Sequence, residues 1–525
     1  MYLATSEEMR QLDCIAINDF GLPGIVLMEN AARSIAMAAL EFWTEWPESP
    51  TVAILAGPGQ NGGDGWALAR IFSAAGFQVK SYLVMPEGRE VKGDAAINLQ
   101  VARNMGLSVE MIHESSPLPP WEEFDLVVDA LFGTGLARPL DGPAAEVLLS
   151  AGSARARLGR RLRVLAVDLP SGLSGDTGRM LGPPLPADLT VTLGAPKIGL
   201  YLQQGPEMCG HIIVGDIGLT PQMLAKAPPR GRLSGMDEFR QYLPVRPADG
   251  HKGTFGHVLL AGGSKGKTGA LVLAAMGAAG SGAALISAAH PASLSDIFET
   301  KLTEAMTLEL PEDGEGQLDA ASGSLLLEYA RGKQALALGP GLGMGEGAAL
   351  TVRTVVASSE RPPLVLDADG LTHLAGRVES LKGRGDVILT PHPGEAARLL
   401  GVDSGAIQSD RLGAAREIAD KSGGVVILKG HNSIIAEPGG GFYLNTTGGN
   451  HMAVGGSGDL LAGLAAGLLA QGVAPFPAAA LAAWVHGRAA DIALAEKGPF
   501  GLTPSMFADR FPEVWRQLVN NQGLI

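Results

Sequence analysis

The chain has 525 residues, with 40 Lys or Arg against 54 Asp or Glu and a formal net charge of −14. An acidic chain of this kind is poorly suited to binding nucleic acid over its whole surface. With 46% hydrophobic and only 18% charged residues, the composition also excludes a coiled coil and a disordered chain. The length allows two large domains or three smaller ones, and we expect two.

The cysteine content and the apolar stretches predict a cytoplasmic protein without membrane spans. The two cysteines, Cys14 and Cys209, have no CxxC spacing, so neither a disulfide framework nor a thiolate zinc site is indicated. The first residues lack the pattern of a secretory signal. Residues 268–290 and 460–486 carry no Asp, Glu, Lys or Arg, but both are rich in Ala and Gly and lack aromatic flanks. We therefore expect them to form buried helices of an α/β domain.

The first half of the chain alternates between short apolar runs and helix-like segments. TVAILAG at residues 51–57 is followed by a Gly-rich loop, a helical segment and the strand-like FQVKSYLV. Further apolar runs end in Gly, Asp or Ser. This alternation predicts a doubly wound, Rossmann-like parallel sheet in a first domain at residues 1–220. A Pro-rich and basic stretch at 221–235 is predicted as a linker, and residues 236–525 as the second domain.

The loop GPGQNGGDG at residues 57–65 satisfies GxGxxG between a predicted strand and a predicted helix. An ordinary dinucleotide site is not favoured, because the next strand ends in Met85 and Pro86 rather than in an acid. Asn61 and Asp64 would instead offer hard oxygen ligands to a cation, while glycine N–H groups could bind phosphate or ribose oxygens. A tight turn with a capping aspartate is the alternative.

Three more polar residues of the first half stand at predicted strand ends. Asp129 follows one apolar run, and Asp168 and Ser171 follow another. Open α/β sheets bind ligands at the carboxyl ends of their strands, so Asn61, Asp129 and Ser171 could together hold a cation. Asp168 would then be free for acid–base chemistry or substrate binding. Each aspartate by itself could equally be a helix cap.

The strand and helix alternation restarts at GHVLLAGG and continues to two long apolar helices. Segments 432–437 and 441–445 are separated by a Gly-rich turn and predict a hairpin near the sheet edge. GGSKGKTG at 262–269 misses the P-loop pattern, because that pattern requires glycine where Ala261 stands. A phosphate contact through Lys265 or Lys267 remains possible on sequence grounds, as does a solvated loop.

Three motifs of the second half carry candidate chemistry. In GGSGDLLAG, consecutive glycines open an apolar helix, and Asp459 lies where a general base beside bound phosphate would lie. His392 of TPHPGE could bind substrate or cap local backbone, and Lys429 of LKGHNS could grip a nucleotide or belong to a surface hairpin. The motif at Asp459 lacks the last glycine of a GxSxG elbow, and no HExxH occurs, so neither a serine hydrolase nor a zinc enzyme is favoured.

These motifs, in their order, resemble the bifunctional NAD(P)H-hydrate repair enzymes, in which an epimerase domain precedes an ADP-dependent dehydratase domain. TSEEMRQLD, GLPGIVLMENAA, GPGQNGGDG, DALFGTGL, VDLPSG and APKIGL resemble the epimerase. HKGTFGHVLLAGG, GPGLG, LDADGL, LTPHPGEAARLLG, LKG and GGSGDLLAG resemble the dehydratase, and imply a ribokinase-like α/β fold for the second domain. The likeness covers nearly the whole chain.

The resemblance implies that the first domain interconverts the R and S hydrates of NADH and NADPH with K⁺ in its site. It assigns K⁺ to Asn61, Asp129 and Ser171, and substrate contact and catalysis to Asp168. The hydrate would also contact two loop segments, namely Gln60, Asn61, Gly62, Gly63 and Asp64, and Gly133, Thr134, Gly135, Leu136, Ala137, Arg138 and Pro139.

The resemblance further implies that the second domain dehydrates the S hydrate to NAD(P)H, using ADP with Mg²⁺. Asp459 matches the proposed base. Hydrate contacts are implied at Ala270, Gly343, His392 and Asp459, and nucleotide contacts at Lys429, Gly430, His431, Asn432, Ser433 and Gly458. The chain departs from the family's usual pattern at Gln60, around Met276 and at 503–505, none of which is a proposed catalytic carboxylate. A homo-oligomer is expected, with neither nucleic acid nor membrane as a partner.

Three alternative functions remain at this point. GGSGD before a helix would also serve a ribokinase-like kinase of a vitamin alcohol, with the first domain as an accessory. One domain could have lost its activity, or the chain could bind adenine nucleotide without turnover. The acids present in both candidate sites favour two active sites.

Overall fold

The computed structural model describes residues 1–136 and 138–520, and these fall into two compact units. The N-terminal unit spans Tyr2–Gly231, and the C-terminal unit holds Met1 and the residues from Arg232 onward. The division lies inside the segment predicted as a linker, 221–235. That segment is not irregular throughout, because it contains helix α7 (Pro221–Lys226) and strand β9 (Gly231–Leu233).

The N-terminal unit is built on a parallel sheet with the strand order β4-β3-β2-β5-β6-β7-β8. The short strand β1 (Tyr2–Leu3) precedes its first helix. The sheet strands are β2 (Thr51–Ala56), β3 (Gln78–Val84), β4 (Ser108–Ile112), β5 (Leu126–Ala130), β6 (Arg163–Val167), β7 (Leu189–Leu193) and β8 (His211–Gly215). The direction of strand addition reverses between β2 and β5, and such a switch point is where doubly wound sheets bind ligands.

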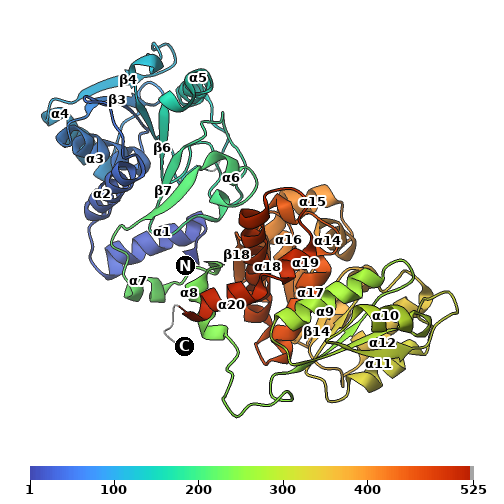
Figure 1. The fold of residues 1–525 in the computed structure, drawn as a ribbon. Helices are drawn as coiled ribbons and strands as arrows, with labels where there is room; N and C mark the ends of the chain where they lie inside the picture. Colours follow the sequence, from blue (N-terminus) through green and yellow to red (C-terminus); the bar gives the residue numbers. More distant parts are fainter. Residues whose placement is uncertain (137, 521–525) are drawn as a thin grey trace. The chain divides into compact units, whose positions relative to one another are not determined.

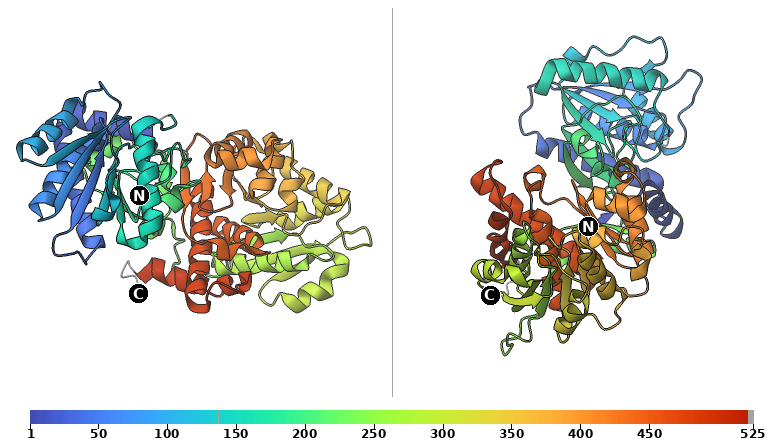
Figure 2. Two further views of the ribbon diagram at one scale, coloured as in Figure 1. Left: turned by 90° about the horizontal axis from the view of Figure 1, so that it is seen from above. Right: turned by 90° about the vertical axis from the view of Figure 1, so that its right-hand side faces the viewer.

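Helices cover both faces of this sheet (Figures 1 and 2). They are α1 (Ser6–Cys14), α2 (Gly24–Phe42), α3 (Gln60–Ala74), α4 (Gly93–Asn104), α5 (Gly142–Leu158) and α6 (Gly205–Met208). Val52 and Ile54 of β2 pack with α2, α3 and α4, whereas Ala53 and Leu55 pack with α5. Because side chains of a strand alternate between faces, an apolar run such as TVAILA can be buried on both sides only in a sheet of this kind.

The C-terminal unit contains a larger mixed sheet with the order β18-β17-β16-β15-β14-β13-β10-β11-β12. Strands from β10 to β16 pair in parallel, while β16, β17 and β18 pair antiparallel, as the predicted hairpin requires. The strands are β10 (His257–Ala261), β11 (Leu285–Pro291), β12 (Met306–Leu310), β13 (Ala335–Leu338), β14 (Leu364–Leu366), β15 (Val387–Leu389), β16 (Val425–Leu428), β17 (Ser433–Ala436) and β18 (Phe442–Asn445).

Three apolar helices, α9, α17 and α18, bury one face of this sheet. The helices of the unit are α8 (Met236–Phe239), α9 (Thr268–Gly280), α10 (Ser295–Lys301), α11 (Ser322–Ala330), α12 (Glu346–Ala357), α13 (Asp369–Thr372), α14 (Pro393–Leu400), α15 (Ser404–Ser409), α16 (Arg411–Ser422), α17 (Ser457–Ala470), α18 (Pro475–Lys497), α19 (Pro504–Ala508) and α20 (Phe511–Asn520).

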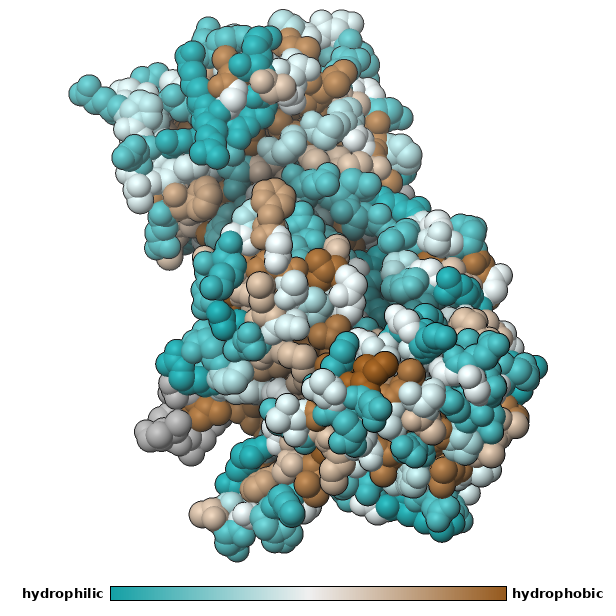
Figure 3. Space-filling model, turned by 45° about the vertical axis from the view of Figure 1, so that its right-hand side comes forward, coloured by the Kyte–Doolittle hydropathy of each residue, from teal (hydrophilic) through white to brown (hydrophobic). Residues whose placement is uncertain are grey.

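The two charge-free stretches of the sequence lie in this core. Residues 268–290 form α9 and then most of β11, so the first stretch is a helix and a strand and not a single helix. Residues 460–486 belong to α17 and α18. No helix among residues 1–136 and 138–520 is long and apolar enough to cross a membrane. On the face drawn in Figure 3, hydrophilic side chains interrupt the apolar ones.

Glycines allow α9 and α17 to cross at backbone contact distance. A Cβ atom added to Gly463 of α17 would lie 1.8 Å from the carbonyl oxygen of Ala274 in α9. A Cβ added to Gly277 of α9 would lie 2.0 Å from the carbonyl oxygen of Leu460. These positions therefore require glycine, and the crossing sets where the N-terminus of α17 lies.

We predict that Gly463→Ala destabilises the C-terminal unit, because the added methyl group overlaps a backbone atom that cannot move without shifting α9. The expected loss is roughly 1–3 kcal/mol, which lowers the unfolding midpoint in calorimetry by about 2–8 °C. Gly269→Ala in α9 is the matched control, since its Cβ would have open space and alanine favours a helix. An unchanged midpoint in Gly463→Ala would contradict the close crossing.

Candidate functional sites

Asp129 and Ser171 form a buried oxygen cluster beneath the switch point of the N-terminal sheet. Asp129 is the penultimate residue of β5 and is fully buried, while Ser171 lies in the loop after β6. The Asp129 carboxylate accepts hydrogen bonds from the Ser171 hydroxyl (2.6 Å) and the Ser171 N–H (2.7 Å). Burial raises the pKa of Asp129 to about 6, although these hydrogen bonds oppose the shift. Burial thus disfavours the ionised form of Asp129, and a bound cation would stabilise that form.

Asn61, at the start of α3, and Asp168, directly after β6, come together beside Gly133. A Cβ atom added to Gly133 would lie 3.1 Å from Asn61 Oδ1 and 3.0 Å from Asp168 Oδ2, so both oxygens face this glycine. The Nδ2 atom of Asn61 is buried and has no hydrogen-bonding partner within the described part of the chain. An unpartnered buried amide beside a cavity is suited to a ligand that completes its hydrogen bonding.

Asp168 is held by a buried lysine that sequence reasoning did not single out. Lys197 follows β7, is 1% exposed, and places its Nζ atom 2.6 Å from Asp168 Oδ1 and 2.7 Å from the carbonyl oxygen of Leu193. Asp168 has a φ of 67°, a strained conformation for a residue other than glycine. The motif APKIGL contained the signal, but nothing local shows that its lysine reaches a strand end.

These residues open onto a cavity of about 520 Å³. Of the residues expected to contact the hydrate, those lining it are Gln60, Asn61, Asp64, Gly133, Thr134, Gly135, Leu136 and Asp168. Gly62 and Gly63 instead allow close packing, against the Gly57 carbonyl and Met28 respectively. Arg138 and Pro139 are not among the lining residues, and Ala137 lies outside the described residues. Helices α1 and α2 also line the cavity, through residues such as Asp13 and Leu27 that the sequence did not indicate.

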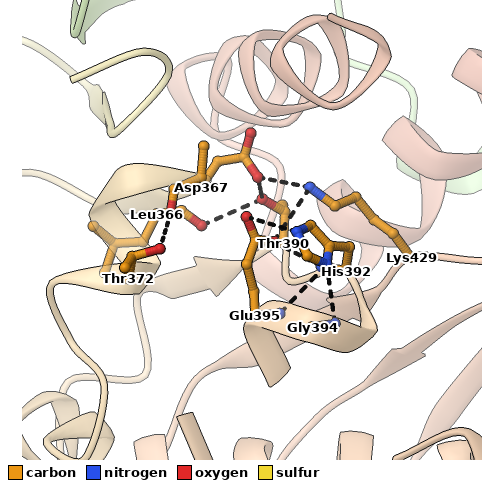
Figure 4. Close-up of polar contacts among 9 residues, drawn as sticks. Leu366, Asp367, Thr372, Thr390, His392, Gly394, Glu395 and Lys429 are labelled. Atoms are coloured by element: carbon orange, nitrogen blue, oxygen red, sulfur yellow. Dashed lines mark hydrogen bonds and ion pairs between the residues drawn. The ribbon is translucent and has the colours of Figure 1, made fainter. Parts of the chain in front are cut away.

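A second lysine and aspartate pair lies at the carboxyl end of the C-terminal sheet. Lys429, directly after β16, places Nζ 2.8 Å from Asp367 Oδ1 and 3.9 Å from Glu395 Oε2. The Thr390 hydroxyl donates to the same Asp367 oxygen at 2.6 Å, and Figure 4 shows these side chains converging. Burial by itself would lower the pKa of Lys429, but Asp367 and Glu395 outweigh it and raise that pKa above its usual value. Asp367 and Glu395 lie within the motifs LDADGL and LTPHPGEAARLLG, whose local pattern does not indicate a role for either carboxylate.

Asp459 joins this cluster from the N-terminus of α17. Burial, and then the charge of Asp367, raise the pKa of Asp459 to about 7, while Lys429 opposes the shift. A Cβ added to the preceding Gly458 would lie 3.1 Å from Lys429 Nζ, so the glycine backbone passes directly over the lysine. The free N–H groups and positive end of a 14-residue helix therefore lie beside Lys429, an arrangement suited to phosphate.

The nucleotide contacts expected from the sequence line a cavity of about 610 Å³. Lys429, Gly430, His431, Asn432, Ser433 and Gly458 all line it, as do His392 and residues between β18 and α17. His392 also caps α14, because its Nδ1 atom accepts hydrogen bonds from the N–H groups of Gly394 (3.0 Å) and Glu395 (3.3 Å). The substrate role and the capping role considered for His392 are therefore compatible.

Ala270, Gly343 and Asp459 do not line that cavity. The Gly343 N–H donates to Asp369 at 2.9 Å, and Lys267 pairs with the same carboxylate at 2.9 Å. Ala270 lies against the loop that contains Gly343, since a Cβ on Gly341 would be 3.0 Å from its methyl group. The charges of Asp367 and Asp369 both raise the pKa of Asp459, so Asp459 experiences the electric field of both groups.

Comparison with known proteins identifies the family. Residues 24–199 match the model of the YjeF-related protein N-terminus, and residues 258–513 match the NAD(P)H-hydrate dehydratase model. The chain is 40% identical to the bifunctional NAD(P)H-hydrate repair enzyme Nnr of Moorella thermoacetica, over 99% of this chain and 97% of that protein. The chain belongs to the family of bifunctional NAD(P)H-hydrate repair enzymes.

Other members of this repair-enzyme family are similar over the same length. The Nnr of Thermofilum pendens is 36% identical over 99% of this chain and 97% of its own, and that of Coxiella burnetii is 35% identical over 99% of both. The dehydratase of Bacillus subtilis, crystallised with ATP and Mg²⁺, is a solved structure with 31% identity and a TM-score of 0.47 that covers 55% of this chain and 98% of that one.

Membership in the repair-enzyme family confirms the family and the α/β fold class predicted from the motifs. It also supports the predicted bifunctional enzyme over the kinase alternative. No group of three or more His, Cys, Asp or Glu side chains that could hold a metal ion occurs among the described residues. The oxygens of Asn61, Asp129 and Ser171 do not form such a group, because Asp129 is the only carboxylate among these three residues.

We predict that Lys429→Met destabilises the fold at pH 8 by roughly 2–3 kcal/mol, because Asp367 and Glu395 would remain buried without a cation. Burial already raises the pKa of Glu395, so this loss should shrink as the pH falls and the carboxyl groups take up protons. Thermal unfolding at pH 8 and pH 5 measures both effects. Lys421→Met, which removes only an exposed pair with Glu417, is the control; equal losses at both pH values would refute the prediction.

Proposed function

We propose that this chain repairs hydrated NADH and NADPH at two separate active sites, one in each unit. The N-terminal site would interconvert the R and S hydrates, and the C-terminal site would dehydrate the S form to NAD(P)H with ADP. The observation that carries the proposal is that each unit holds its own lysine and aspartate pair beside a cavity, in a chain similar to bifunctional repair enzymes over its whole length.

In the epimerase site, Asp168 would bind the hydrate and exchange protons with it. Lys197, Thr192 and the Leu193 N–H all donate to Asp168 Oδ1, which leaves Oδ2 directed toward Gly133 and the cavity. Because Oδ1 is fixed by three donors, Oδ2 keeps one orientation relative to a bound ring, as acid–base catalysis requires. The loop at Gly133–Leu136 would contact the hydrate from the facing wall.

A potassium ion fits the oxygen set of this unit. Asn61 offers an amide oxygen, Ser171 a hydroxyl, and Asp129 a fully buried carboxylate whose ionisation burial disfavours. These hard, mostly neutral oxygens suit a monovalent cation better than a divalent one. When bound, K⁺ would offset the Asp129 charge and attract an oxygen of the hydrate. Asn61 would connect the potassium site to the hydrate site, since its side chain lines the cavity and its Oδ1 atom faces Gly133.

In the dehydratase site, Asp459 would be the base and Lys429 would bind nucleotide phosphate. A carboxyl group with a pKa near 7 can accept a proton from the hydrate hydroxyl at neutral pH, while the hydroxyl oxygen attacks the terminal phosphorus of ADP and the P–O bond to AMP breaks. The new phosphate ester would then leave as inorganic phosphate, and the neighbouring ring carbon would lose a proton to give NAD(P)H. Phosphate oxygens would be bound by Lys429 and by N–H groups at the start of α17. Asp367 and Glu395 supply oxygens suited to a Mg²⁺ that is carried mainly by the phosphates, because Lys429 already neutralises part of their charge.

Two further points of the proposal concern location and assembly. We place the enzyme in the cytoplasm because its two cysteines are unpaired, Cys14 exposed and Cys209 buried, as in a reducing compartment. A homo-oligomer stays a prediction.

The decisive experiment for the proposed function is recovery of reduced-nicotinamide absorbance from a mixture of R and S NADPH hydrates with ADP and Mg²⁺. Net phosphorylation of a vitamin alcohol from ATP, without recovery, would favour the kinase instead.

We predict that Asp459→Asn abolishes dehydration and preserves epimerisation, and that Asp168→Asn has the reverse effect. Each carboxylate belongs to a different compact unit, so the losses should be at least 100-fold and independent. In the unmodified enzyme, the rate of dehydration should fall about tenfold per pH unit below pH 7, where Asp459 becomes protonated. The two activities are measured on purified S and R hydrates. Loss of both activities from either change would contradict the two-site proposal.

We also predict that replacing K⁺ by Na⁺ slows epimerisation and leaves dehydration of the S hydrate unchanged. The smaller ion would be poorly matched to oxygens fixed by the Asp129–Ser171 hydrogen bonds. Ser171→Ala should weaken the dependence on K⁺, which titration of the R-hydrate activity with KCl would detect. Equal epimerisation rates in KCl and NaCl would remove the potassium assignment.

A further inference from the structure

The epimerase cavity is lined by further carboxyl groups besides Asp168, and the proposed function gives them no part in catalysis. Asp13 of α1 and Asp64 of α3 line the same cavity as Asp168 and Lys197. Within the described part of the chain, neither Asp13 nor Asp64 has a hydrogen-bonding or ion-pair partner, although Asp64 is only 7% exposed. Three carboxyl groups therefore share a single buried lysine, and that lysine is committed to Asp168.

Epimerisation of a hydrate requires more than one proton carrier. Water adds to the ring carbon next to nitrogen, because the nitrogen electron pair stabilises positive charge at that carbon. To invert it, a proton must reach the hydroxyl oxygen on one face as the C–O bond breaks and the nitrogen forms a C=N bond. Water then adds to the opposite face and loses a proton. One carboxyl group on one face cannot perform both transfers.

We propose that Asp13 is a second proton-transferring residue of the epimerase site, acting together with Asp168. This rests on the proposed function of that site. In one direction Asp13 gives its proton to the departing hydroxyl, and Asp168 Oδ2 accepts a proton from the water that adds. One water leaves and one water adds, so the hydrate keeps its composition. Afterwards Asp13 takes up a proton from solvent and Asp168 releases the proton that it accepted. In the reverse direction the two residues exchange roles.

The surroundings of Asp13 suit this role better than those of Asp64. Burial raises the pKa of Asp13 to about 6, with Lys197 opposing and Asp168 adding to the shift. Asp13 is only half-buried, so solvent can restore its proton. Burial raises the pKa of Asp64 well above its usual value, and the charges of Asp168 and Asp13 add to the shift. Asp64 is also only 7% exposed, so it is shielded from the solvent that would renew its proton. A group that titrates near neutrality can both give and accept a proton.

The other charged groups at the cavity do not provide a third carrier of this kind. Arg10 lies on the same helix as Asp13, while Arg89 and Asp94 line the cavity from the segment that enters α4. Lys197 is committed to Asp168 and to the Leu193 carbonyl. Of the charged groups that line the cavity, Lys197, Asp168 and Asp64 interact electrostatically with Asp13, whereas Arg10 pairs with Glu7 at 2.6 Å.

The test is Asp13→Asn in the full chain, with purified R hydrate, ADP and Mg²⁺, so that epimerisation limits recovery of NADPH. The expected result is a loss of at least 100-fold in kcat with KM changed less than threefold, and unchanged dehydration of the S hydrate. The limb near pH 6 in the pH dependence of kcat/KM should disappear in the variant. Asp19→Asn, an exposed carboxylate outside the cavity, is the matched control and should keep full activity.

Asp13→Glu separates a proton-transferring role from a structural one, because it keeps the acid and should recover at least a tenth of the rate and the pH limb. Epimerisation by Asp13→Asn within threefold of the unmodified enzyme, with the pH limb retained, would overturn the inference. So would a loss in Asp13→Asn that appears only in KM. If the unmodified chain does not epimerise the R hydrate at all, the proposed function of the N-terminal unit fails instead.

Discussion

Each unit of this enzyme depends on a lysine that is buried beside an aspartate at the carboxyl end of a parallel sheet. Removing a charged ammonium group from water costs several kcal/mol, and only close, well-oriented carboxylates offset that cost. Lys197 has one such partner, Asp168, and Lys429 has Asp367 with Glu395 slightly farther away. The lysine therefore fixes the position of the aspartate as much as the aspartate fixes the lysine.

In both sites the carboxyl groups outnumber the single lysine. Asp13, Asp64 and Asp168 share Lys197, and Asp367, Glu395 and Asp459 share Lys429. Because the cavities are partly withdrawn from water, the surplus charge is expensive and some carboxyl groups retain protons near neutrality. This surplus explains why a cation, a proton or a positively charged reaction centre is favourable there.

The order of strands brings the site residues together. In the N-terminal sheet, β2 and β5 are neighbours at the switch point, so Asn61 in the helix after β2 and Asp129 near the end of β5 lie at the same edge of the sheet. In the C-terminal sheet, the cluster follows β14, β15 and β16, which supply Asp367, Thr390 and Lys429 from adjacent strands. The crossing of α9 and α17 through Gly277 and Gly463 then directs Gly458 and Asp459 onto Lys429.

The sequence by itself determined the elements and the residues that stand at their ends. Alternating apolar runs, Gly-rich loops and the aspartates after them indicated Asp129, Asp168, Ser171 and Asp459, because strand period, turn formation and helix starts are local properties of the chain. Only the tertiary structure decided that Lys197 reaches Asp168, that Asp367 and Glu395 surround Lys429, and that Asp13 lines the epimerase cavity. It also showed that Gly62 and Gly63 pack against Gly57 and Met28, outside the cavity lining. These facts depend on burial and on distances between segments far apart in the chain, and no local pattern of residues encodes either.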